Sequence, residues 1–364
     1  MGTLKISGKI DLGQFWPNGG SDADTTTLLL TVGPDAFSFA ADDFNFLPTR
    51  AFANASTNRR DTDGLDTAGK KSDSYVVKTS ANRPDRVTVR LQGIDAPELH
   101  YLAKITDETT APFAGTPQQK RMASTTLDKD YRQYRGETAT VQLWRELSLN
   151  GKHNSLECEF VSKNIEKPDD VIDKYHRFVG DIEVKYPNGR RKNVNRWLLK
   201  NGWVFPAFYN SMLNKEINDF AALWAEGQVK PQSVWQFYRS KMEQFDFDLI
   251  YNKKTQSNQP VYNALKDRGL VMIPKLFRRY IHYAIMQKAG LGVPATFQSY
   301  LQQFNNRDAF FLKADFLANP QTAARRLLSA HLPNDTFDLS PADLILEEAA
   351  SGSLYKNGVL VGSF

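Results

Sequence analysis

The residues best suited to chemistry lie in one short acidic turn. Residues 86–92 alternate between apolar and polar side chains, which is the period of a β-strand. The chain then turns through Gly-Ile-Asp-Ala-Pro-Glu, which places Asp95 and Glu98 three positions apart. One carboxylate of such a pair can bind a hard cation while the other acts on a water molecule.

Arg90 adds a group that can bind phosphate to the same segment. A planar guanidinium makes paired hydrogen bonds to a phosphate. In phosphodiester hydrolysis, a cation and arginines stabilise the charge on the phosphoryl oxygens, and a carboxylate accepts a proton from water. Arg90, Asp95 and Glu98 supply these groups. On composition alone, a surface turn with ordinary ion pairs explains the segment better.

The overall composition indicates a folded chain. Its 364 residues are 41% hydrophobic and 12% aromatic, which is enough to bury a core, and this length favours two domains. The net charge is +5, but 46 basic residues face 41 acidic ones. The charge therefore fits a mixed surface at least as well as a nucleic-acid partner.

Several classes of protein are disfavoured. Cys158 is the only cysteine, so no internal disulfide forms, and five scattered histidines do not suggest a zinc site. No run of about 18 apolar residues is present, so we expect no transmembrane helix and no membrane partner. The N-terminus lacks the layout of a signal peptide, so we expect a cytoplasmic protein, with export by another route left open.

The periodicity of the first part of the chain predicts strands and helices of a small twisted barrel rather than a βαβ array. Strands are predicted over residues 4–10, 25–32, 86–92, 157–161 and 178–184, and helices over 136–147, 194–201 and 215–228. Gly202 is expected to end the second helix, and Asn214 to cap the third.

After about residue 240 the pattern becomes mainly helical. Helices are predicted over residues 259–268, 274–289, 294–304, 307–317, 319–330 and 340–350. Lys275, Arg278 and Arg279 share one face of the second of these helices. This basic face could contact a nucleic-acid backbone, or it could be the solvated face of a packed helix.

Several motifs together resemble the staphylococcal nuclease-like (thermonuclease) family. The segment Val-Arg-Leu-Gln-Gly-Ile-Asp-Ala-Pro-Glu is similar to the family signature. Other motifs follow the family order: Ser21-Asp-Ala-Asp-Thr25, Arg135-Gly-Glu-Thr-Ala, Asp173-Lys-Tyr-His-Arg177 and Val194-Asn-Arg-Trp-Leu. Collinear motifs are more specific than any single one.

This resemblance implies an α+β fold, with an OB-type five-stranded β-barrel and helices in residues 1–240. Insertions would fall at about residues 36–85 and 99–134. Residues 241–364 would form a mainly α-helical C-terminal domain of unknown role, a candidate site for a protein partner. OB barrels bind single strands in a groove that carries aromatic and basic side chains.

The resemblance also implies a metal site. Asp24 and Asp95 would bind the ion, the backbone carbonyl of Ala96 would complete the protein's share, and Asp22 would lie just outside this shell. Calcium is the family's usual ion, and a set of oxygen ligands is also compatible with Mg²⁺ or Mn²⁺.

The resemblance also implies which residues contact the attacking water, the phosphate and the base of the nucleic acid. Glu98 would act on the attacking water, and Arg90 and Arg177 would clamp the phosphate. The residues implied to contact the nucleotide are Lys174 and Tyr175 at its phosphate end and Phe208 and Tyr209 near its base.

Two positions depart from the family pattern. Ala23 replaces a glycine in the first motif, where a positive φ would strain it. His176 replaces the glycine before Arg177, and we interpret it as a surface turn residue.

The sequence therefore predicts a metal-dependent endonuclease that cleaves DNA, RNA or both. The resemblance implies that it has little sequence specificity and leaves 3′-phosphate ends. The alternative is a catalytically weak nucleic-acid-binding or scaffold module whose helical domain recruits a partner.

Overall fold

A computed structural model gives the structure of most of the chain. It describes residues 2–16, 19–30, 37–39, 45–46, 59–61, 74–76, 86–103, 105–124, 129–165, 173, 177–239, 251–252, 271–303, 308–347, 353–356 and 359–363. The helix predicted over 259–268 and the residues Lys174, Tyr175 and His176 lie outside these ranges.

Five strands close into a barrel. They are β11 (Ser155–Ile165), β1 (Gly2–Asp11), β2 (Thr25–Leu30), β7 (Arg86–Leu91) and β12 (Phe178–Lys185), in this order, and β11 also pairs with β12. The pair β7–β12 is parallel and the other barrel pairs are antiparallel. Alternate side chains of β7 and β12 are buried inside the barrel. The predicted α+β fold with an OB-type barrel is confirmed.

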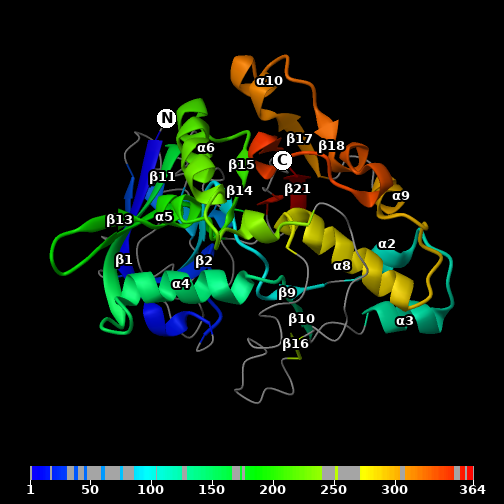
Figure 1. The fold of residues 1–364 in the computed structure, drawn as a ribbon, viewed down its shortest axis with the longest axis horizontal. Helices are drawn as coiled ribbons and strands as arrows, with labels where there is room; N and C mark the ends of the chain where they lie inside the picture. The colour runs from blue at the N-terminus through cyan, green and yellow to red at the C-terminus, as the bar shows by residue number, and fades with distance from the viewer. Residues whose placement is uncertain are drawn as a thin grey trace.

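Three helices pack on this barrel (Figure 1). They are α4 (Gly136–Ser148), α5 (Val194–Lys200) and α6 (Asn214–Gln228). Gly202 follows α5 with a φ of +71°, as predicted for a glycine after a helix. The predicted cap at Asn214 is wrong, because Asn214 is the first helical residue and Leu213 is the N-cap.

The buried amide of Asn195 joins the barrel to α5. Its Oδ1 accepts from the Ile182 amide at 3.2 Å, and its Nδ2 donates to the carbonyls of Gln92 at 2.9 Å and Gly180 at 3.2 Å. The residue is fully buried, so these backbone groups have no access to water in its place. Asn195 thus holds the end of β7, where the acidic turn begins, against β12.

The C-terminal region, residues 271–347, contains helices and a small sheet. The helices are α8 (Pro274–Lys288), α9 (Phe297–Gln302) and α10 (Lys313–Ala318). The sheet runs in the order β15 (Phe208–Tyr209), β19 (Leu344–Leu346), β17 (Ala309–Leu312), β18 (Arg326–Leu327). The prediction of helices in the C-terminal region is therefore confirmed. The sheet also includes β15, which belongs to the barrel part of the chain.

Two of the helices predicted in this region are wrong, and the helix predicted over 307–317 is wrong over Ala309–Leu312, which forms β17 before α10 begins. Residues 319–330 contain β18 and the start of a 3₁₀ turn at Leu328–His331, and residues 340–347 contain a 3₁₀ turn at Pro341–Asp343 followed by β19. Ser340 caps only that single turn. All three residues of β19 are buried and pair with neighbouring strands, so tertiary pairing overrides the local start signal for a helix.

The described part of residues 99–134 packs on the C-terminal region. Phe113, Ala123 and Tyr131 share one hydrophobic cluster with Phe277 and Ile281 of α8. The elements here are β9 (Tyr101–Leu102), α2 (Asp107–Thr110), α3 (Pro117–Ser124) and β10 (Lys129–Tyr131), with β16 (Tyr251–Asn252) beside β10. In Figure 1, α2 and α3 of this segment lie beside α8.

The remaining elements are short. The strands are β3 (Phe37–Phe39), β4 (Asn45–Phe46), β5 (Arg59–Asp61), β6 (Ser74–Val76), β8 (Ile94–Asp95), β13 (Arg191–Asn193), β14 (Phe205–Pro206), β20 (Ser353–Lys356) and β21 (Val359–Ser363). The 3₁₀ turns not yet given are Leu12–Gln14, Val234–Phe237 and Pro333–Asp335. Among the described residues, no helix is long and apolar enough to cross a membrane.

Replacing Asn195 tests the link between α5 and the barrel. Asn195→Ala removes the Asn195 partner of the Ile182 amide and of the Gln92 carbonyl, while the Gly180 carbonyl still accepts from the Gln92 amide. We therefore expect a loss of roughly 2–4 kcal/mol in the free energy of unfolding. Urea denaturation measures it. Asn188→Ala, at an exposed turn, is the control and should cost less than about 1 kcal/mol. Equal losses in the two variants would contradict this role.

Candidate active site

The register of two strands brings the first acidic loop to the acidic turn. Thr25 of β2 pairs with Arg90 of β7, and the Leu91 amide donates to the Asp24 carbonyl at 2.8 Å. The Ala96 amide donates to Asp24 Oδ2 at 3.0 Å. These contacts join positions far apart in sequence, and they place Asp24 beside Asp95.

The turn after β7 needs glycine at position 93. Gly93 has a φ of +74°, and a Cβ there would lie 2.2 Å from a ring carbon of Phe220 in α6. Ala23, in contrast, is not among the described residues with positive φ, so replacing the family's glycine there causes no such strain. Strain at Ala23 was expected only if its backbone were in the left-handed region, and it is not.

Asp22, Asp24 and Asp95 form an acidic group in which Asp24 and Asp95 are buried and Asp22 is half-buried. Asp22 Oδ1 accepts from the amides of Thr25 at 2.8 Å and Asp24 at 3.3 Å, and Thr25 Oγ1 donates to Asp24 Oδ1 at 2.9 Å. Burial and the charge of Asp24 raise the pKa of Asp22 well above its usual value. Burial also raises the pKa of Asp95, although Arg278 and Arg90 oppose the shift.

Asp24 is the member of the group that stays charged most readily. Burial alone would raise its pKa, but Arg90, the Ala96 amide, Arg177 and Thr25 outweigh burial and lower the pKa below its usual value. Repulsion among close carboxylates is relieved by a bound cation. Asp24 and Asp95 offer hard oxygen donors for one, although no set of three or more acidic, His or Cys side chains in the described part of the chain has a metal-binding arrangement.

Two arginines lie beside this acidic group. Arg90 Nη2 donates to Asp95 Oδ1 at 3.0 Å. Arg177 donates from Nε and Nη2 to Asp173 Oδ2 at 2.8 and 2.6 Å, and from Nη1 to Thr25 Oγ1 at 3.0 Å. Asp173 thus orients Arg177 toward the loop that carries Asp24, so the structure brings both predicted phosphate-binding arginines to one place.

Glu98 lies at the end of the same turn. Its amide donates to Gln133 Oε1 at 2.9 Å, and the Gln133 amide donates back to the Glu98 carbonyl at 2.8 Å. A Cβ on Gly136, the first residue of α4, would lie 2.8 Å from the carbonyl oxygens of Pro97 and Glu98. Burial raises the pKa of Glu98 to about 7, although the charge of Arg278 opposes the shift.

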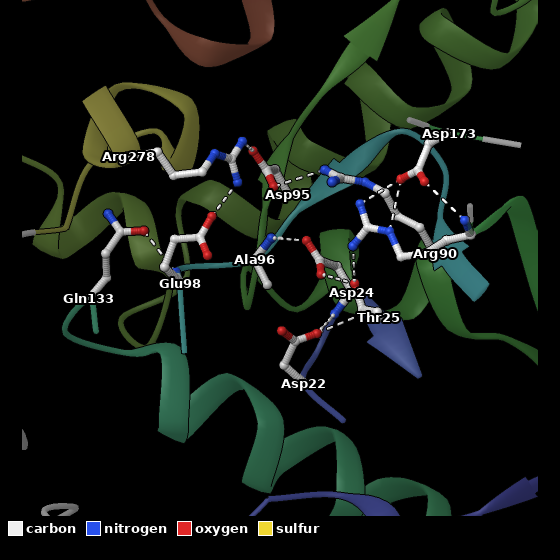
Figure 2. Close-up of polar contacts among 11 residues, drawn as sticks. Asp22, Asp24, Thr25, Arg90, Asp95, Ala96, Glu98, Gln133, Asp173 and Arg278 are labelled. Carbon is white, nitrogen blue, oxygen red and sulfur yellow. Dashed lines mark hydrogen bonds and ion pairs between the residues drawn. The ribbon is translucent and has the colours of Figure 1, made fainter. Parts of the chain in front are cut away.

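Arg278, from α8, also reaches this site. Its Nη1 donates to Glu98 Oε1, and its Nη2 lies 3.7 Å from Asp95 Oδ2. Figure 2 shows Arg278 and Arg90 approaching Asp95 from opposite sides. The interpretation of Arg278 as part of a backbone-binding face is therefore corrected, because its guanidinium contacts the acidic turn.

The other basic residues of that face also have partners inside the protein. Arg279 donates to both carboxylate oxygens of Asp308, at 2.5 and 3.0 Å, and Lys275 lies 3.6 Å from Asp308. Asp308 is buried, so these ion pairs hold α8 to the segment before β17. The sequence left two alternatives for this basic face, a phosphate-binding surface or a solvated surface. Neither is correct, because the basic side chains form ion pairs within the protein.

The aromatic residues predicted to lie near a base differ in exposure. Phe208 is fully buried in the hydrophobic core, so its ring has no face open to a base and the predicted base contact is wrong for this residue. Tyr209 is half-buried and packs against both hydrophobic clusters. When ionised, its hydroxyl would raise the pKa of Arg90, so the two side chains lie near each other.

Three contributors to the site were not predicted for the roles they have. The sequence places Asp173 only within a motif, gives no sign of a role for Gln133, and predicts a different surface for Arg278. The five-residue motif that holds Asp173 and Arg177 could have indicated their pairing. No local signal marks Gln133 or Arg278, since both contacts with Glu98 depend on how distant segments pack.

One comparison with known proteins bears on these motifs. Residues 88–237 match the family model described as staphylococcal nuclease homologue. The matched range contains Arg90, Asp95, Glu98 and Arg177, while Asp24 precedes it and Arg278 follows it. No curated protein matches the chain.

The raised pKa of Glu98 predicts how stability depends on pH. In metal-free protein its pKa is about 7, against about 4.3 in an unfolded chain, so the folded state binds this proton more tightly. Ionisation therefore costs stability as the pH rises between these two values. Glu98→Gln removes the cost, so its melting temperature relative to wild type should increase from pH 5 to pH 8 in EDTA.

The control for this experiment is Glu157→Gln, at an exposed carboxylate on β11. Its difference from wild type should stay constant over the same range. A Glu98→Gln difference that does not widen with pH would contradict the raised pKa.

Proposed function

The chain belongs to the staphylococcal nuclease-like family through residues 88–237, and we propose that it is a metal-dependent phosphodiesterase acting on DNA, RNA or both. The observation that carries the proposal is the grouping of Asp24, Asp95, Glu98, Arg90 and Arg177 at one edge of the barrel (Figure 2). This set combines oxygen donors for a cation, a carboxylate for water and two guanidinium groups for phosphate.

Asp24, Asp95 and the carbonyl of Ala96 would hold the cation, with Asp22 beside them. The raised pKa values of Asp22 and Asp95 support this, because a cation offsets the mutual repulsion that contributes to them. Oxygen donors favour Ca²⁺, with Mg²⁺ and Mn²⁺ as alternatives. When bound, the ion would offset negative charge on the phosphoryl oxygens.

The protein side chains would act as follows. Glu98 accepts a proton from the attacking water, whose oxygen bonds to phosphorus. Arg90 and Arg177 bind the phosphate and stabilise its charge as the P–O5′ bond breaks. The O5′ atom takes a proton from solvent, so one product ends in a 3′-phosphate and the other in a 5′-hydroxyl.

A nucleic-acid-binding module is the second candidate. The ion pairs Arg177–Asp173 and Arg278–Glu98 favour it, since they already satisfy two of the groups that catalysis requires. In that case the protein would bind nucleic acid without cutting it, and the C-terminal region would serve to recruit a protein partner. Cleavage assays separate the two candidates.

The first prediction from the proposed function concerns the site residues. Purified protein should cleave single-stranded DNA, duplex DNA or RNA, and Arg177→Ala or Glu98→Gln should slow cleavage by roughly 10²–10³-fold. Rates are measured on an end-labelled oligonucleotide with saturating metal. Arg191→Ala, which removes an exposed ion pair with Glu183 on the same barrel, should cleave like wild type.

Retention of wild-type cleavage by both site variants would place the activity elsewhere. Tight binding by the wild type without cleavage, in Ca²⁺, Mg²⁺ and Mn²⁺ alike, would favour the binding module.

The second prediction concerns the metal and the products. EDTA should abolish cleavage, because without the cation the negative charge on the phosphoryl oxygens lacks its main counter-charge. Adding Ca²⁺ should restore cleavage. A polymerase should extend the 3′ ends of the products only after phosphatase treatment. Cleavage in EDTA, or products that are extended without phosphatase, would contradict the mechanism.

A further inference from the structure

The C-terminal region reaches Glu98 through the side chain of Arg278. The guanidinium bonds to Glu98 Oε1, and the Arg278 side chain is 28% exposed, whereas the Glu98 side chain is 15% exposed. A buried carboxylate without a cation is costly, and Asp95 and Asp24 add repulsion to it. Arginine is a suitable partner, because it keeps its charge in such surroundings.

A second contact joins Glu98 to the same region. Gln133 exchanges two hydrogen bonds with the backbone of Glu98, and its Nε2 donates to the Met272 carbonyl at 2.8 Å. Gln133 and Met272 are both fully or almost fully buried. Residues 272–278 therefore contact the Glu98 side chain directly through Arg278 and its backbone indirectly through Gln133.

The segment itself is firmly packed. Leu276, Phe277 and Ile281 of α8 are fully buried. On the adjoining face, Arg279 forms its double hydrogen bond with Asp308. These contacts set the rotation of α8 and therefore the direction in which Arg278 points.

We propose that Arg278 and Gln133 are positioning residues that hold Glu98 for its action on water, so that the C-terminal region forms part of the active site. This inference rests on the proposed nuclease function. Arg278 binds Oε1, and Oε2 is the oxygen that would accept the water proton. Removing Arg278 should leave substrate binding by Arg90 and Arg177 intact while the carboxylate loses its orientation.

The test is a double-mutant cycle on the full-length protein. Arg278→Ala should lower kcat by about tenfold or more with little change in KM, because a contact made through Glu98 acts on the chemical step. In a Glu98→Gln background, Arg278→Ala should have almost no further effect, since the two residues act as one unit. Arg278→Lys, which retains the charge, should recover part of the loss.

The matched control is Arg325→Ala. Arg325 forms an exposed double ion pair with Glu347 in the same region, and its removal should leave kcat and KM unchanged. A rise in kcat for Arg278→Ala would overturn the inference, because Arg278 would then block the site. A rise in KM, or a full effect that persists in the Glu98→Gln background, would overturn it in favour of a direct phosphate contact.

A second measurement does not depend on cleavage. In EDTA at pH 8, Arg278→Ala should lower the melting temperature, and the loss should shrink when Glu98→Gln is also present. Equal losses in both backgrounds would show that Arg278 does not hold Glu98. If the wild type cleaves nothing, the proposed function fails, while this cycle still decides whether the contact with Glu98 exists.

Discussion

The site depends on keeping Asp24, Asp95 and Glu98 close together where little water reaches them, although like charges repel each other. Each carboxylate has its own counter-group: the Ala96 amide for Asp24, Arg90 for Asp95 and Arg278 for Glu98. Without these partners the acids would protonate or move apart. Burial and, after it, this repulsion raise the pKa values of Asp95 and Glu98, and a cation would relieve the repulsion.

The barrel satisfies this constraint through strand register. Pairing of β2 with β7 places the loop before β2 beside the turn after β7, and Asn195 fixes the end of β7 against β12. Gly93 then turns the chain so that Asp95 and Glu98 face the arginines. Backbone hydrogen bonds between paired strands thereby bring residues of the site together although they lie far apart in sequence.

Much of the candidate site could be predicted from the sequence because its motifs are local. The acidic turn, the loop with Asp24 and the motif with Arg177 each carry their residues within a few positions, and strand alternation marks β7 and β12. The contacts of Gln133 and Arg278 could not be predicted in this way, since they depend on two segments packing on the barrel. The base contact predicted for Phe208 is wrong because the resemblance gives only its position along the chain and does not reveal that the ring is buried.

The C-terminal region illustrates the same limit. Its helix signals at residues 319–330 and 340–350 are local, whereas its short strands form by pairing with one another, and β19 also pairs with β15 from the barrel part. The same packing brings α8 to Glu98. Barrel and C-terminal region therefore share a sheet and, in our account, a site.

The most direct test of the account is the rate at which Asp24→Asn cleaves a labelled single-stranded oligonucleotide under single-turnover conditions with Ca²⁺. Asp24 lies far in sequence from the acidic turn, and the variant keeps its size while removing its charge. The account predicts a rate slower than wild type by on the order of a hundredfold, with oligonucleotide binding retained. A rate equal to that of wild type would contradict the assignment of this site.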